Sequence, residues 1–115
     1  MIKKENRMRT RFQFNITRNK GMHQRGSYFH IFMFRPEGYN DATQFGIVVS
    51  QKAAKKAVER NRIKRLYRES ILSNLEKFPK NSWIVIQPTA LSLGKTYEEI
   101  NTDLIESIQK IPFTD

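Results

Sequence analysis

The 115-residue chain has no cysteine, only two histidines, one tryptophan and five glycines. Without cysteine it can form no disulfide and no cysteine-ligated zinc site, which suits a reducing cytoplasm. No apolar stretch approaches the roughly 20 residues that span a membrane, and the basic N-terminus lacks the apolar core of a signal peptide. We therefore expect a cytoplasmic protein that makes no membrane contact.

Residues able to perform catalysis are equally scarce. His23 and His30 lie in or beside one predicted strand, with no acidic pair at metal-ligand spacing nearby. No glycine-rich phosphate loop is present, and Glu98 and Glu99 suit the start of a helix. We expect no catalytic residue and no metal-binding residue in this chain, which is typical of a binding protein.

The charge is strongly positive and unevenly distributed. The net charge is +10 and the isoelectric point is about 10.2, which favours a polyanionic partner. Residues 1–69 contain 17 Lys or Arg against 5 Asp or Glu, whereas residues 70–115 contain 4 against 6. The partner-binding surface should come from the first two thirds of a single domain, residues 1–115.

Basic residues are densest between Lys52 and Arg68. This stretch contains eight Lys or Arg and one acid, Glu59. An ordinary exposed helix would place acids four residues from its bases, and this one hardly does. Guanidinium and amide groups are donors suited to phosphate oxygens and 2′-hydroxyls. We predict that nucleic acid is bound by Arg60, Asn61, Arg62, Lys64, Arg65 and Arg68.

Local patterns predict most of the secondary structure. Residues 27–34 and 45–50 are rich in aromatic and β-branched residues and read as strands, which we expect to pair as a hairpin across the turn at 36–41. Residues 52–76 read as a helix, and residues 83–87 read as a strand.

The sequence pattern predicts secondary structure clearly near the C-terminus and ambiguously near the N-terminus. Thr96 and Glu99 form a capping-box pattern, followed by apolar residues at helical spacing up to Ile111. Near the N-terminus, Phe12 and Phe14 alternate with polar residues, which by itself favours a strand.

One feature of the predicted basic helix does not fit an ordinary amphipathic pattern. At 100° per residue, Ala57, Lys64, Arg68, Ile71 and Leu75 fall within about 60° of one another. Two cations thus share an arc with apolar residues expected to face the core, which favours a functional role. The alternative is that their alkyl stems lie on the core and their charges reach solvent.

The run from Arg60 to Glu69, RNRIKRLYRE, closely resembles the arginine-rich signature helix of the bacterial ribonuclease P protein subunit. Flanking segments occur in the same order as in that family, namely the strands at 45–50 and 83–86 and the helix start at 97–100. The resemblance covers roughly residues 7–111.

The resemblance implies an α+β two-layer sandwich with the order α-β-β-β-α-β-α, similar to domain 2 of ribosomal protein S5. The implied sheet is mixed and four-stranded, and the signature helix lies in a left-handed β-α-β crossover. It also implies a helix near the N-terminus, with Thr10 as N-cap, and we adopt that helix over the strand. Since the local patterns give only three clear strands, one strand of the four is either missing or poorly marked.

By the same resemblance, the chain is a subunit of an endoribonuclease that removes the 5′ leader of precursor tRNA. The implied partners are a catalytic RNA and the leader, with no obligate protein partner. The catalytic centre and its Mg²⁺ ions would belong mainly to the RNA.

Members of the family bind the leader in a cleft between the first helix and the sheet, which places Phe12, Phe32 and Lys52 at cleft positions. Ile16 and Gln51 depart from the aromatic and the lysine common in the family. Aromatic rings there would stack on single-stranded bases. The alternative is that Phe12 and Phe32 belong to the core.

Two other functions remain open at this point. A small ribosomal protein would match the size and charge but would need no aromatic groove for a single strand. A nonspecific DNA-binding protein would show no preference for RNA.

Overall fold

The computed structural model describes residues 2–111. The principal elements are α1 (Arg11–Lys20), β1 (Met22–Arg25), β2 (Phe29–Phe34), β3 (Gln44–Ile47), α2 (Ala57–Ser73), β4 (Trp83–Pro88) and α3 (Tyr97–Gln109). This order confirms the predicted α-β-β-β-α-β-α arrangement. No helix within the described residues is long and apolar enough to cross a membrane.

The four strands form one mixed sheet in the order β1-β2-β4-β3. β2 is antiparallel to both neighbours, while β3 and β4 are parallel and are joined through α2. The predicted hairpin between residues 27–34 and 45–50 is therefore wrong. The central place beside β2 goes to β4, whose Ile84, Val85 and Ile86 are completely buried, as expected of a strand covered on both faces.

The strand that local patterns missed is β1. It contains a single apolar residue, Met22, because it lies at the sheet edge with half-buried and exposed residues alternating. Its partner β2 alternates as predicted, with Phe29, Ile31 and Met33 buried and the residues between them half-buried.

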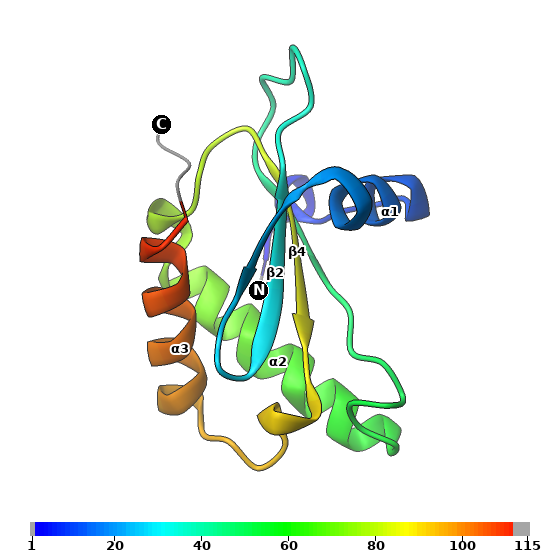
Figure 1. Cartoon of the computed structure of the whole chain (residues 1–115), viewed down its shortest axis with the longest axis vertical. Coiled ribbons are helices and arrows are strands. Elements are labelled where there is room, and N and C mark those ends of the chain that lie inside the picture. Colours follow the sequence, from blue (N-terminus) through cyan, green and yellow to red (C-terminus); the bar gives the residue numbers. More distant parts are fainter. Residues whose placement is uncertain (1, 112–115) are drawn as a thin grey trace.

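The face of the sheet that carries Phe29 and Ile31 is the core face. α2 and α3 cover it, and they contribute fully buried Ile63, Tyr67 and Leu104. Each such side chain contributes about 1.5–3 kcal/mol through removal of its apolar surface from water. Figure 1 shows α3 and α1 on opposite sides of the central strands β2 and β4.

α1 lies across the second face, against β2 and β4. Thr10 and Gln13 form a capping box, which confirms Thr10 as the N-cap and the helix over the strand. The residues of α1 that are buried are polar, Gln13 and Thr17. The buried side of α1 is therefore not marked by apolar residues at helical spacing. For this reason the alternation of Phe12 and Phe14 with polar residues wrongly favoured a strand.

α2 begins at Ala57, five residues later than predicted. Residues 50–54 instead form a tight turn in which the backbone N–H groups of Ala53 and Ala54 donate to Ser50 O at 3.1 Å. After Ser73 a short 3-10 turn follows at Leu75–Lys77.

The buried stripe of α2 consists of Ile63, Leu66, Tyr67, Ser70 and Ile71. The expectation that the arc from Ala57 to Leu75 faces the core is wrong for most of its members. Ala57, Arg68 and Leu75 are exposed, and Lys64 is half-buried at the edge of the stripe.

Candidate nucleic-acid interface

The outward face of α2 is built from the signature residues. Positions 58, 61, 62, 65 and 68 fall within about 120° of one another on the helix, opposite the buried stripe. They border an open surface hollow lined by Val58, Glu59, Asn61, Arg62, Arg65 and Arg68. With one carboxylate among three guanidinium groups, this surface suits a polyanion.

The signature arginines differ in what they contact. Arg60 Nη1 donates to the backbone oxygens of Ala54 (2.9 Å) and Lys55 (2.7 Å). Arg62 Nη2 donates to Lys95 O at 3.0 Å.

Arg65 and Arg68 form no hydrogen bond or ion pair within residues 2–111 and are exposed. Their guanidinium groups therefore keep all their donors for a ligand. Lys64 and Arg68 also border a second hollow, where α2 approaches Phe14 on α1 and Phe45 on β3.

A groove runs beside α1 on the second face of the sheet, and we call it the α1 groove. It is lined by Arg9, Thr10, Arg11, Phe14, Asn15, Arg18 and Val48. Phe14 packs on Gly46 of β3, where a Cβ would collide with its ring. Basic residues on one wall and an aromatic ring on the sheet side are the usual components of a single-strand site.

Beyond Val48, the same face of the sheet extends from the groove across β4 to β2. Val48 N donates to Ile86 O at 2.9 Å, which extends the β3–β4 pairing and sets Val48 beside Gln87. Gln87 in turn lies opposite His30 of β2. These side chains are only half-buried, whereas Val85 next to them is completely buried.

Three aromatic rings form a stack at the β1 edge of this face. The His23 ring lies 4.7 Å from Phe32 and 4.9 Å from His30, at interplanar angles of 14° and 29°. His23 Nε2 and His30 Nδ1 are 2.7 Å apart, so one of them donates to the other. Burial, with help from His23 and Arg25, lowers the pKa of His30.

The three residues predicted for the leader cleft lie in different environments. Phe32 is half-buried on the second face of the sheet but does not line the α1 groove, and Lys52 is exposed in the turn after β3. Phe12 is 65% exposed and lies about 160° around α1 from Phe14. The structure thus excludes Phe12 from the core, and it brings Phe14 to the sheet instead.

Sequence reasoning missed Phe14, Arg11 and Arg18 as groove residues. Their common side of α1 becomes apparent only once Gln13 and Thr17 are known to be buried. The glycine at position 46 was the one available signal, because it makes room for a large side chain from another element.

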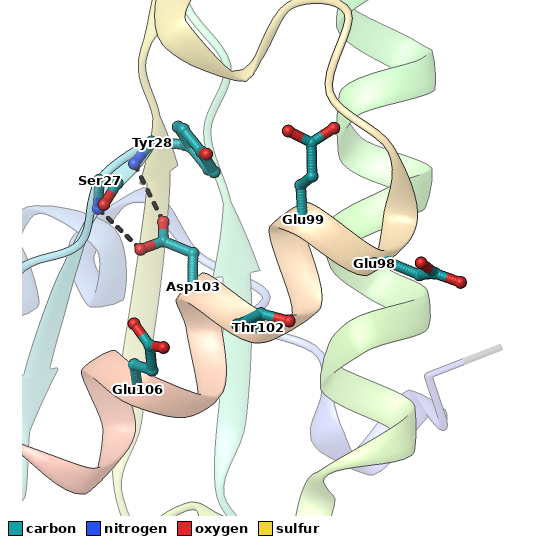
Figure 2. A pocket seen from close by; sticks show the side chains of 7 residues that line it. All are labelled: Ser27, Tyr28, Glu98, Glu99, Thr102, Asp103 and Glu106. Atoms are coloured by element: carbon teal, nitrogen blue, oxygen red, sulfur yellow. Dashed lines mark hydrogen bonds between the residues drawn. The ribbon is translucent and has the colours of Figure 1, made fainter.

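The opposite side of the molecule is acidic. Figure 2 shows a pocket on α3 bordered by Glu98, Glu99, Asp103 and Glu106. The Asp103 carboxylate accepts from Ser27 N (2.8 Å) and Tyr28 N (3.0 Å), which fixes the β1–β2 turn to α3 (Figure 2). This side would repel phosphates, as the charge distribution along the chain predicts.

Within residues 2–111, no three His, Asp or Glu side chains gather in a way that could hold a metal ion. Glu99 on α3 serves as a helix cap. Hydrogen bonds from the Thr96 backbone N–H and side chain lower the pKa of its carboxyl.

The fold and sequence match known proteins along nearly the whole chain. The family model Ribonuclease P matches residues 2–112. The ribonuclease P protein component of Pseudanabaena sp. is 33% identical over 110 residues, which cover 96% of this chain and 94% of that one. That of Clostridium novyi is 28% identical and covers 95% and 96%.

Solved structures agree. The ribonuclease P protein of Thermotoga maritima superposes with a TM-score of 0.79 at 28% identity, covering 93% of this chain and 98% of that one. The Staphylococcus aureus protein, at 23% identity, shares the fold with a TM-score of 0.80 and covers 92% and 94%. The resemblance found in the signature helix is confirmed, and the ribosomal-protein alternative finds no support. This chain belongs to the ribonuclease P protein family.

Proposed function

We propose that this chain is the protein subunit of a ribonuclease P holoenzyme, and that it binds a catalytic RNA and the 5′ leader of precursor tRNA. The holoenzyme then hydrolyses one phosphodiester bond and leaves a 5′-phosphate on the mature tRNA. The observation that supports this most strongly is the outward face of α2. Its Arg65 and Arg68 are exposed and form no hydrogen bond or ion pair with the described residues, in a chain whose family is ribonuclease P.

The two basic surfaces suit two parts of the RNA. The outward face of α2 presents Arg62, Arg65 and Arg68 around an open hollow, which suits the phosphates of a folded RNA, and we assign it to the catalytic RNA. The α1 groove is lined by Phe14, Arg11 and Arg18, and Phe32 of β2 lies on the same face of the sheet. Rings that stack on bases and guanidinium groups that bind phosphates suit a single-stranded leader. Lys52 lies at the end of β3 and would meet the leader at the edge of the groove.

The chemistry is assigned to the RNA partner. Since the described residues hold no cluster able to bind Mg²⁺, we propose that magnesium ions are held mainly by the RNA. The protein would contribute affinity and orientation, and it would act in the cytoplasm, where precursor tRNA is processed.

Purification of the chain from its host and sequencing of the copurified RNA tests this assignment. The expected result is enrichment of one structured RNA together with tRNA precursors that retain their leaders. An Arg65→Gln, Arg68→Gln variant should lose the structured RNA. Recovery of ribosomal RNA in place of both would refute the proposal.

A further inference from the structure

The segment between β3 and α2, residues 50–56, is folded before any partner binds. We call it the basic loop. Its backbone forms a tight turn after Ser50, whose oxygens accept hydrogen bonds from Ala53 N and Ala54 N at 3.1–3.2 Å. Ala53 and Ala54 are 6% and 2% exposed and thus anchor the loop to the core. The loop therefore has one backbone path fixed at both ends.

Arg60 fixes the second half of this loop. Its Nη1 donates to two successive carbonyl oxygens, those of Ala54 at 2.9 Å and Lys55 at 2.7 Å. Both carbonyls precede the first turn of α2, and a short neutral side chain at position 60 would leave them without this partner. Arg60 is half-buried, whereas the neighbouring Arg62 is exposed.

The basic loop carries exposed lysines beside the outward face of α2. Lys52, Lys55 and Lys56 are exposed, and none has an ion pair within residues 2–111. The single acid nearby is Glu59, whose carboxylate accepts from Lys56 N at 3.4 Å. The lysine ammonium groups are thus held next to the arginines without neutralising partners.

We infer that the basic loop is a second phosphate-binding part of the RNA interface, that Lys55 and Lys56 are its contact residues, and that Arg60 is a positioning residue for them. The inference rests on the proposed function and changes the role first predicted for Arg60. Arg60 acts through the loop backbone, and its own charge adds little direct contact.

The physical advantage is preorganisation. Ordering a loop on binding costs about 1–2 kcal/mol of backbone entropy for each residue that becomes fixed. A loop already held by Ser50 and Arg60 avoids that cost, so its lysines add affinity for phosphate at once.

The test measures binding of the protein to the ribonuclease P RNA of the same source. Lys55→Gln, Lys56→Gln should weaken binding by about tenfold and lower the log–log salt slope by about 0.7 per lost phosphate contact. The matched control is Lys77→Gln, Lys110→Gln, which removes two exposed lysines from outside the basic surfaces and should leave affinity within about twofold.

Arg60→Gln then separates positioning from direct contact. In the otherwise unchanged protein it should weaken binding by about tenfold, whereas in the Lys55→Gln, Lys56→Gln background its effect should shrink to about threefold or less. Full additivity of the two changes would overturn the positioning role. Failure of the unchanged protein to bind this RNA would refute the proposed function itself, which is a distinct outcome.

Hydrogen exchange supplies a readout that does not depend on RNA affinity. In the free protein, the amides of Ala53 and Ala54 should already exchange slowly, and Arg60→Gln should accelerate them. Rapid exchange in the free protein that slows only when RNA binds would show a loop that orders on binding, and would overturn the inference.

Discussion

Arginine side chains within one short signature take different roles. Arg60 and Arg62 donate hydrogen bonds to backbone carbonyl oxygens, whereas the guanidinium groups of Arg65 and Arg68 donate none within the described residues. The sequence identifies all of them as basic but cannot distinguish them, because their partners belong to segments that only the fold brings close. The density of positive charge was enough to predict all of them as RNA-binding residues.

Arg65→Gln, Arg68→Gln should weaken binding to the catalytic RNA without loss of fold, because both side chains are exposed and form no hydrogen bond or ion pair within residues 2–111. Each lost phosphate contact should lower the log–log salt slope by about 0.7. Binding titrations over a range of salt concentrations measure this. An unchanged slope and affinity would remove these arginines from the interface.

His30 should make the stability of the free protein depend on pH. Burial, His23 and Arg25 lower its pKa in the folded state, so the unfolded chain takes up a proton that the folded chain resists. Stability should therefore fall as the pH drops through about 6.5, the ordinary pKa of histidine. Gln87, which faces His30 from β4, carries no charge to offset this.

Urea denaturation at pH 7.5 and pH 5.5 measures the effect. The unchanged protein should be less stable at the lower pH, and His30→Gln should reduce the difference. Equal stability of the unchanged protein at both values would contradict the role of His30.

Among the secondary-structure elements, prediction succeeded where periodicity or capping marked the element. The alternation of β2 and the capping box of α3 appear as expected. It failed at β1, which has almost no apolar residue, and at the pairing of β3, which depends on the distant strand β4. Sheet order is a long-range property that local pattern does not determine.

We expect the side of α1 that meets the sheet to determine which phenylalanine contributes most to leader binding. Phe14→Ala and Phe32→Ala should each weaken binding of tRNA with a leader by about 1–3 kcal/mol for each stacked base lost, and leave leaderless tRNA unaffected. Phe12→Ala should have a smaller effect, because that ring is 65% exposed at the rim of α1.

Thermal melts of the same variants supply the control. Phe12→Ala should melt like the unchanged protein, and the other two should remain folded at the assay temperature. A larger leader-dependent loss in Phe12→Ala than in Phe14→Ala would place the leader on the other side of α1.

The contact between α3 and the β1–β2 turn depends on one carboxylate. Asp103 accepts from two backbone N–H groups, so Asp103→Ala should leave both without that partner and cost about 1–3 kcal/mol of stability. Glu106→Ala on the same helix is exposed and should change stability by about 0.5 kcal/mol or less. Chemical denaturation compares them, and equal midpoints would contradict this role for Asp103.

At the scale of the whole molecule, acidic and basic side chains gather on different elements of the fold. α3, which carries exposed glutamates, lies on the opposite side of the central strands from α1 (Figure 1). Exposed cations lie on α1, on the basic loop and on the outward face of α2. This asymmetry was readable from the sequence as a basic first two thirds and a slightly acidic remainder. We therefore expect the chain to present its two basic surfaces to RNA and to keep the acidic α3 away from it.

We propose that the protein binds and orients RNA while the catalytic RNA performs the cleavage. Cleavage of a precursor tRNA with a 5′ leader tests this division of labour, and it is measured at moderate magnesium concentration with the protein alone, the RNA subunit alone and both together. We expect no cleavage by the protein alone and efficient cleavage at the mature 5′ end when both are present. Site-specific cleavage by the protein alone that survives ribonuclease treatment of the preparation would contradict it.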